Sequence, residues 1–328
     1  MPDTVRLISP ERVRDELWKM LSSRAPAQAL ADLQQHSLLF PILPEITELM
    51  GVAQSAPHIS DVWAHTLRTV TNAQHFRDWL LGGSTHDDSP ATTAWQSALE
   101  PWRYRLREHF LQPIAGDHQR VDWLVWQAMW HDAGKAVTAA QTLDEDGAIR
   151  YRFLGHEEIS AELAARRLFE LRFSRVECDL TETVVRAHMR PHHLHDSFKH
   201  APISRRACYR FFRDTGGRNS DDLAGIDVLM LALADYQAIY AAPQPPEWRE
   251  YLEHVVQLLA FAFDHSGLAL LQHPLVDGYS VMRHLNLEPG PAVGAVLERL
   301  REAQAAGEVT TRDEALALAT AWQQESQG

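Results

Sequence analysis

The stretch Trp130-His131-Asp132-Ala133-Gly134-Lys135 decides how this 328-residue sequence is interpreted. It ends an apolar run, Trp123 to Met129, which indicates a buried helix. Removing a histidine and an aspartate from water at the end of such a helix is costly, so polar groups there are normally paired or bound to metal. Neighbouring helical side chains diverge by roughly 100°, yet they can converge on one ion where the helix end faces a cavity. The dipeptide alone is common, so the rest of the chain has to support a metal site.

The composition limits the classes of protein to which this sequence can belong. With 45% hydrophobic residues, the sequence can form one large or two modest domains with their own cores. A formal net charge of −13 argues against a general nucleic-acid coat but leaves room for a local basic pocket that binds a nucleotide or an RNA end. The 18 histidines stand out, because histidine is the commonest metal ligand.

Targeting signals are absent from this sequence. Its 2 cysteines, Cys178 and Cys208, form neither a zinc-finger pattern nor a disulfide framework, which favours a reducing compartment. No signal-peptide core follows Met1, and no apolar run reaches the ~18 residues that a membrane span needs. We therefore expect a cytoplasmic protein with no membrane partner.

Helical periodicity dominates the chain. It predicts short helices within residues 1–50 and longer ones at 61–81, 91–112 and 119–132. Further helices are predicted at 156–170, 175–189, 201–213, 222–241, 247–264, 278–285, 291–306 and 311–324. One β-hairpin is predicted at about 143–153, where Asp146-Gly147 supplies the turn. The expected fold is therefore all-α, with one small hairpin and helical N- and C-terminal extensions.

Four more ionisable residues lie on apolar or motif-like segments: His65, His156, His188 and Asp235. Asp235 closes the largely aliphatic run Leu229 to Ala234, where a solvated helix face cannot easily explain a carboxylate. It is either a buried aspartate that a hydroxyl or an arginine satisfies, or a metal ligand. The residues alone leave both interpretations open.

The order His…His-Asp…His…His…Asp resembles the HD superfamily of metal-dependent phosphohydrolases. That resemblance implies an HD-domain helical bundle and, position by position, a first set of metal ligands: His65, His131, Asp132 and Asp235. It also implies a second site that shares one carboxylate with the first: His156, His188 and Asp132. Mixed imidazole and carboxylate ligands suit Mn, Fe, Co, Ni or Zn better than Ca, with Mg a candidate if fewer histidines ligate. We therefore expect one or two divalent ions.

A narrower resemblance covers nearly the whole sequence. Ile8 to Leu17 is similar to the neck helix of CCA-adding enzymes and class II poly(A) polymerases, and segments from Phe40 onward are similar to the HD domain and tail of some of them. It implies a neck-like segment at 1–50, an HD domain at 51–241 with an insertion at 82–118, and a helical tail at 242–328. The paired carboxylates of the nucleotidyltransferase head do not precede the neck, so we expect no CCA polymerisation by these residues.

The resemblance also implies a mechanism. Bound metals lower the pKa of a water and polarise a phosphoryl oxygen, with Asp132 as the bridging carboxylate. Lys135, three residues beyond Asp132, is expected to stabilise phosphate charge; the alternative is a solvated surface lysine. Arg190 is a candidate phosphate clamp or a structural salt-bridge residue, and Arg68, three residues after His65, is a further candidate.

Other basic residues are given structural interpretations. His192, His193 and His195 follow Pro191 and are predicted to lie exposed in a polar loop, and His58 and His109 are predicted to lie on the surface. Four arginines occur at helical spacing within residues 205–213. We interpret them as the basic outer face of a half-buried helix rather than as an RNA groove.

HD domains of CCA-adding enzymes are associated with 2′,3′-cyclic phosphodiesterase, 2′-nucleotidase and phosphatase activities. The resemblance therefore predicts a metal-dependent phosphohydrolase that acts on nucleotide or RNA 2′/3′ phosphate esters, with tRNA as a candidate partner. Two alternatives stay open: an HD hydrolase of other nucleotides or dinucleotides, and a non-catalytic tRNA- or RNA-binding module that works with a separate nucleotidyltransferase. No oligomeric state is predicted.

Overall fold

The computed structural model describes residues 8–85, 87–216, 223–240, 243–263 and 274–325. Regular structure in these ranges is mostly helical, with two short antiparallel strand pairs, so the predicted all-α fold is confirmed. The predicted helix limits 222, 241 and 264 lie outside the described residues. Contacts divide the chain into two compact units, Met1–Lys199 with Ala224–Val255 and His200–Leu223 with Val256–Gly328. The predicted boundaries at 50 and 241 stay predictions.

Short helices begin the first unit. They are α2 (Pro10–Leu21), α3 (Pro26–Gln35), α4 (Leu39–Ile42) and α5 (Pro44–Thr47). Proline opens α2, α3 and α5, because its fixed φ suits the first helical turn and its missing N–H is not needed there. Leu17 and Leu21 of α2 are buried, so this segment packs as part of the unit.

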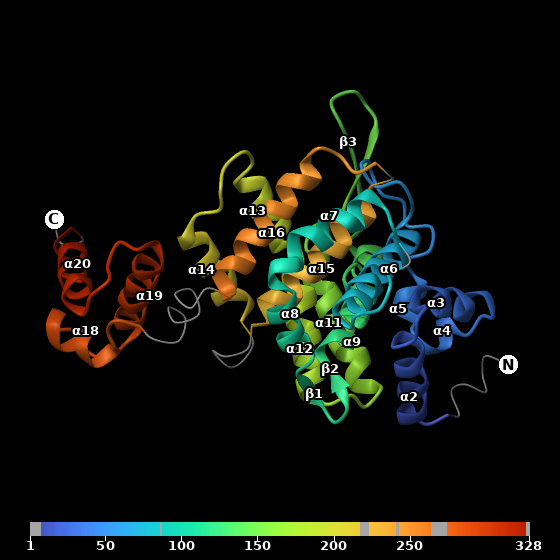
Figure 1. Cartoon of the computed structure of the whole chain (residues 1–328), viewed down its shortest axis with the longest axis horizontal. Coiled ribbons are helices and arrows are strands. Elements are labelled where there is room, and N and C mark those ends of the chain that lie inside the picture. Colours follow the sequence, from blue (N-terminus) through green and yellow to red (C-terminus); the bar gives the residue numbers. More distant parts are fainter. Residues whose placement is uncertain (1–7, 86, 217–222, 241–242, 264–273, 326–328) are drawn as a thin grey trace. The chain divides into compact units, whose positions relative to one another are not determined.

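Five helices form the centre of the first unit (Figure 1). They are α6 (Val62–Leu80), α9 (Arg120–Trp130), α11 (His156–Glu170), α12 (Arg175–Ala187) and α15 (Ala224–Ile239). Helices α6, α9 and α15 pack on one another, while α11 packs against α12, which also contacts α9 and α15. Helix α15 is apolar all round and buried along nearly its whole length, which is typical of a central helix.

The predicted helix at 91–112 is interrupted. Helix α7 (Pro90–Leu99) passes into a 3-10 turn, Glu100–Trp102, that holds Pro101, and α8 (Arg103–Phe110) follows. Proline in a helix interior removes a hydrogen bond and clashes with the preceding turn, which explains the break. Strands β1 (Pro113–Ala115) and β2 (His118–Gln119) form a small antiparallel pair that was not predicted.

The predicted hairpin is confirmed, although it begins earlier than expected. Helix α10 (Lys135–Thr138) leads into β3 (Ala140–Leu143), which pairs with β4 (Ile149–Arg152) in the register Leu143↔Ile149. Asp144 Oδ1 accepts from the amides of Asp146 and Ala148 and so closes the turn. The hairpin projects beyond the neighbouring helices of this unit (Figure 1).

The polar loop predicted after residue 190 is instead a helix, α13 (Arg190–Ser197). Pro191 lies in its first turn, where proline starts a helix rather than breaking it. His195 is buried there. Helix α16 (Glu247–Phe263) follows later in the chain.

The second unit contains α14 (Arg205–Thr215), α18 (Gly278–Leu285), α19 (Pro291–Ala306) and α20 (Arg312–Glu325). Its core includes Val281, Leu285 and Leu300. Helix α14 packs against α19, and its arginines pair with glutamates: Arg206 with Glu308, Arg210 with Glu302, and Arg213 with Glu298. The basic face of α14 is thus neutralised within the unit. No helix in the described ranges is long and apolar enough to cross a bilayer.

Candidate metal centre

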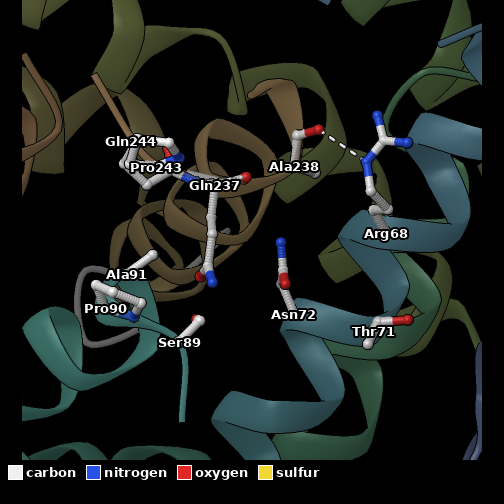
Figure 2. Close-up of a pocket in the computed structure, with 10 residues that line it drawn as sticks. All are labelled: Arg68, Thr71, Asn72, Ser89, Pro90, Ala91, Gln237, Ala238, Pro243 and Gln244. Atoms are coloured by element: carbon white, nitrogen blue, oxygen red, sulfur yellow. Dashed lines mark hydrogen bonds between the residues drawn. The ribbon is translucent and has the colours of Figure 1, made fainter. Parts of the chain in front are cut away.

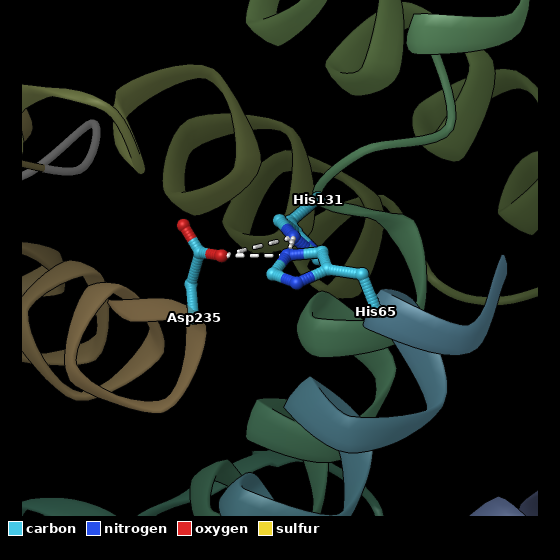
Figure 3. A group of neighbouring side chains, drawn as sticks. All are labelled: His65, His131 and Asp235. Carbon is cyan, nitrogen blue, oxygen red and sulfur yellow. Dashed lines mark hydrogen bonds and ion pairs between the residues drawn. The ribbon is translucent and has the colours of Figure 1, made fainter. Parts of the chain in front are cut away.

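All six predicted ligands are buried and gathered in the first unit. They form two groups, each with ligand atoms within 4.8 Å of one another: His65, His131 and Asp235, and Asp132, His156 and His188. Figure 3 shows the first group, in which side chains from α6, the end of α9 and α15 point toward one another. His65 Nε2 lies 2.8 Å from Asp235 Oδ1, and His131 Nε2 lies 3.6 Å from the same oxygen.

Asp132 reaches both groups with different oxygens. Its Oδ2 atom lies 3.2 Å from His131 Nε2 and 3.6 Å from His65 Nε2. Its Oδ1 atom lies 3.3 Å from His156 Nε2. The carboxylate therefore stands between two sets of imidazoles, which is the arrangement that a carboxylate shared by two metals requires.

Local sequence places each histidine at or near a helix end. His131 and His188 are the C-cap residues of α9 and α12, and His156 is the first residue of α11. Gly155, with φ +74°, turns the backbone into α11 in a conformation that glycine adopts without strain. His65 lies in the first turns of α6, whose N-terminus Asp61 caps by accepting from the Ala64 amide.

Backbone hydrogen bonds set the tautomers of three of these histidines. The Nδ1 atoms of His131, His156 and His188 lie 2.8, 2.8 and 2.6 Å from the carbonyl oxygens three residues earlier. Only a protonated Nδ1 can donate to a carbonyl, so Nε2 is left to face the centre as a ligand atom. His188 Nε2 is buried without a hydrogen-bond partner among the described residues. The ligand atoms present therefore fit a divalent metal ion.

The buried carboxylates are held in their charged form. Burial raises the pKa of Asp132, but nearby His131 and Lys135 outweigh it, and the pKa lies well below its ordinary value. The pKa of Asp235 is likewise held low, because hydrogen bonds from His131, His192 and His65 outweigh burial. Two negative charges are thus concentrated in a dry site.

The imidazoles respond to those charges in different ways. Burial lowers the pKa of His131, but Asp132 and Asp235 overcome it and raise that pKa to about 10. Burial lowers the pKa of His65 and His188 below the ordinary value. A divalent cation held by His131 Nε2 would have to displace the proton from that atom.

Lys135 is buried, in contrast to a solvated surface lysine. Its Nζ atom lies 2.8 Å from Asp132 Oδ2, donates to Gln54 Oε1 at 2.9 Å, and stands 5.3 Å from the centre of the Phe153 ring. The ammonium group is therefore held at the edge of the centre by contacts on three sides.

The two arginines predicted to bind phosphate lie in different surroundings. Arg190 is the half-buried first residue of α13. Arg68 donates from Nε to the carbonyl of Ala238 at 3.0 Å and from Nη2 to Ser60 Oγ at 2.9 Å. The structure thus places Arg68 beside a cavity next to the centre rather than among the ligand groups. The phosphate roles of both arginines stay predictions.

Sequence reasoning missed two histidines at the centre. His192 Nε2 lies 3.1 Å from Asp235 Oδ2, and its ring stacks on those of Tyr236 and Tyr251. The helix-starting role of Pro191 was the signal that could have found it. His58, in a loop without periodicity, has its ring centre 5.2 Å from that of His65. Burial and Lys135 lower the pKa of His58 to about 4.

The prediction that His109 lies on the surface is wrong. His109 is buried, with Nε2 2.7 Å from Asp227 Oδ2, and Arg120 Nη1 donates to the same oxygen at 2.6 Å. Burial raises the pKa of Asp227, but Arg120 and His109 outweigh it and lower that pKa. Helix α15 therefore carries a carboxylate balanced inside the protein, eight residues before Asp235.

Comparison with known proteins agrees with this geometry. Residues 106–227, which hold four of the six predicted ligands, match the family model of the HD domain. Residues 1–50 match a model described as the probable RNA and SrmB-binding site of polymerase A. Residues 106–227 are therefore similar to the HD domain, as the order of histidines and aspartates predicted, and the match supports metal-dependent phosphohydrolase chemistry as the general class.

Three named relatives show which enzymes this chain resembles. The chain is 32% identical to the CC-adding tRNA nucleotidyltransferase of Thermus thermophilus, over 95% of this chain and 56% of that protein. It is 30% identical to the A-adding tRNA nucleotidyltransferase of Deinococcus radiodurans, over 97% of this chain and 59% of that protein. The Multifunctional CCA protein of Halorhodospira halophila is 27% identical over 72% of this chain and 50% of its own length. The predicted resemblance to CCA-adding enzymes is confirmed, and the chain spans between 50% and 59% of these relatives.

Proposed function

We propose that this chain is a metal-dependent phosphohydrolase that opens or removes 2′/3′ phosphate esters of nucleotides or RNA ends, as a 2′,3′-cyclic phosphodiesterase and phosphomonoesterase. The observation that carries the proposal is the position of Asp132, whose two oxygens approach two separate groups of buried imidazoles. A carboxylate shared in this way suits a pair of metals that act on one phosphate.

Each residue of the centre has a distinct part in this proposal. His65, His131 and Asp235 would hold one ion, and His156 and His188 the other, with Asp132 common to both. Mn, Fe, Co, Ni or Zn suits these donors, with Mg a further candidate. When bound, the metals supply an activated water and polarise the phosphoryl group.

Lys135 supplies the positive charge that the ligands do not. Its ammonium lies beside Asp132 Oδ2, where it can donate to a phosphoryl oxygen as charge builds up there. Burial strengthens this interaction because little water screens it. Asp132 and Lys135 are therefore the residues to which we assign catalysis.

The substrate class rests on the comparisons. Residues 1–50 match an RNA-binding model, and the relatives are named for action on tRNA. These matches support an RNA end, including that of tRNA, or a nucleotide derived from one. The same matches favour a second candidate function, a non-catalytic RNA-binding module that works with a separate nucleotidyltransferase. An HD hydrolase of other nucleotides or dinucleotides is the remaining alternative.

The test is turnover after chelation and reloading with Mn, Co, Ni, Zn or Mg. Substrates are 2′,3′-cAMP, 2′-AMP, 3′-AMP and bis-p-nitrophenyl phosphate. We expect metal-dependent hydrolysis that Asp132→Ala abolishes and that Asp15→Ala, at an exposed carboxylate of α2, preserves. No turnover with any metal, or equal turnover by Asp132→Ala, would overturn the proposal. Tight filter binding of tRNA without hydrolysis would favour the RNA-binding module.

A further inference from the structure

A cavity of about 170 Å³ in the first unit is lined by residues of α6, α15 and the start of α7 (Figure 2). Its lining includes Arg68 and Asn72 of α6, Gln237 of α15, and Gln244, with Pro90 and Pro243 among the apolar lining residues. A cavity of roughly 150 Å³ suffices for a benzene ring. The space therefore fits one aromatic ring system and offers both polar and apolar contacts to it.

The cavity lies one helical turn from the first ligand group. His65 of α6 contacts Asp235 of α15, and Arg68, three residues later, donates to the carbonyl of Ala238, three residues beyond Asp235. These two cross-helix contacts are therefore displaced by roughly 4.5 Å along the helices. The cavity therefore borders the helical turns of α6 and α15 that follow two of the predicted ligands.

Three amides in the lining have their orientation fixed by atoms that can only accept. Asn72 Nδ2 donates to the carbonyl of Ala234 at 2.9 Å, and Gln244 Nε2 donates to that of Gln237 at 3.2 Å. Gln237 Nε2 donates to Thr92 Oγ1 at 3.1 Å. Since the Thr92 hydroxyl proton goes to Asp87 Oδ2 at 2.5 Å, Thr92 accepts from the Gln237 amide.

The nitrogen of each amide is thus directed to the protein, so the group that each amide can still offer to a ligand is its oxygen. Gln244 Oε1 is buried and has no hydrogen-bond partner among the described residues. A buried acceptor without a donor is costly. A ligand that donates an N–H group to Gln244 Oε1 is therefore favoured. The three amides thus favour the donating edge of a ligand.

We propose that this cavity binds the base of the substrate nucleotide and prefers bases with an exocyclic amino group, adenine above all, over uracil. The inference rests on the proposed function, because the metals hold the phosphate while the cavity holds the base. The amino hydrogens donate to the amide oxygens, and the ring lies against the prolines. The cavity therefore sets base preference without touching the reacting phosphate.

The experiment compares substrates with and without a base. For Gln244→Ala we expect KM for 2′,3′-cAMP to rise about three- to tenfold, the loss of one hydrogen bond, with kcat unchanged. Hydrolysis of bis-p-nitrophenyl phosphate, which has no base, stays at the wild-type rate. The wild type prefers 2′,3′-cAMP to 2′,3′-cUMP, and Gln244→Ala loses that preference. Gln28→Ala, at an exposed glutamine of α3, changes nothing.

An unchanged KM for 2′,3′-cAMP, or an equal change for bis-p-nitrophenyl phosphate, would overturn the base site. Should the wild type hydrolyse none of these substrates, the proposed function fails but the cavity is still testable. Ligand-observed NMR with adenosine then decides, because adenosine carries the base without a phosphate. Binding that Gln244→Ala weakens supports the site, and no binding at millimolar adenosine refutes it.

Discussion

A methyl group on Gly134 would lie 2.5 Å from the carbonyl oxygen of His156. The Gly134 amide also donates to Ser160 Oγ at 2.8 Å, so the turn after α9 is pressed against the first turn of α11. Asp132 belongs to that turn and His156 to that helix. The close approach that glycine permits is therefore what brings one carboxylate within reach of both histidine groups.

Gly134→Ala should weaken the metal centre although Gly134 is not itself a ligand. The added methyl group forces the turn away from α11, and we expect a loss of about 1–3 kcal/mol in the free energy of unfolding. Calorimetry should also show weaker binding of the ion held by His156 and His188. Gly294→Ala is the control, because nothing lies within 4 Å of the added carbon in the interior of α19. Wild-type stability and metal binding in Gly134→Ala would contradict this account.

His192→Ala should weaken metal binding without reducing the number of ions. The His192 ring contacts Asp235 Oδ2, while the other oxygen of that carboxylate, Oδ1, contacts His65. Loss of such an orienting partner typically costs roughly 10- to 100-fold in metal affinity, which isothermal titration measures directly. The neighbouring exposed His193→Ala should match the wild type. A drop in stoichiometry would instead make His192 a ligand.

Lys135→Ala should lower kcat far more than it changes metal content. Loss of one donor to a developing charge costs roughly 10²- to 10³-fold, and Lys135→Arg should recover part of it. Exposed Lys199→Ala serves as the control. Full activity in metal-loaded Lys135→Ala would remove Lys135 from the mechanism.

Asp227→Asn should change how stability depends on pH. The pKa of Asp227 is lowered in the folded protein, so its contribution is present above the unfolded value of about 3.9 and is lost as pH falls through the folded pKa. At pH 7 the variant removes the charged oxygen to which Arg120 Nη1 donates, and breaking such a buried pair costs about 3–5 kcal/mol.

Denaturant unfolding at neutral and acidic pH measures this difference. The gap in stability between wild type and Asp227→Asn should narrow as pH falls below about 4, whereas exposed Asp146→Asn should follow the wild type throughout. A gap that is constant with pH would show that the Asp227 charge is not what stabilises the fold.

The structure gathers all six predicted ligands, and they divide into two groups as the resemblance implied, with Asp132 near both. Histidines and aspartates at the ends of apolar runs are conspicuous, because such positions rarely hold polar groups without partners. Their order along the chain matched a known pattern, and the structure gathers all six. Which oxygen of Asp132 approaches which imidazole depends on the packing of α9 against α11, and spacing along the chain does not encode it.

The predictions that failed have identifiable physical causes. Pro191 was interpreted as a loop signal although proline also starts helices, so α13 and the contact of His192 were not predicted. His109 has no neighbour in sequence that reveals its partner, because Asp227 lies 118 residues away. The pairs β1–β2 and Arg210–Glu302 are likewise made by tertiary contacts. The hairpin was found because its turn and strands are contiguous.

The two buried carboxylates of helix α15 have different charged partners. Asp227 has the permanent charge of Arg120 beside it, while the charged partners of Asp235 among the described residues are histidines. The charge balance of Asp235 therefore depends on the protonation of those histidines and on any cation at the centre. That of Asp227 rests on an arginine that is always charged.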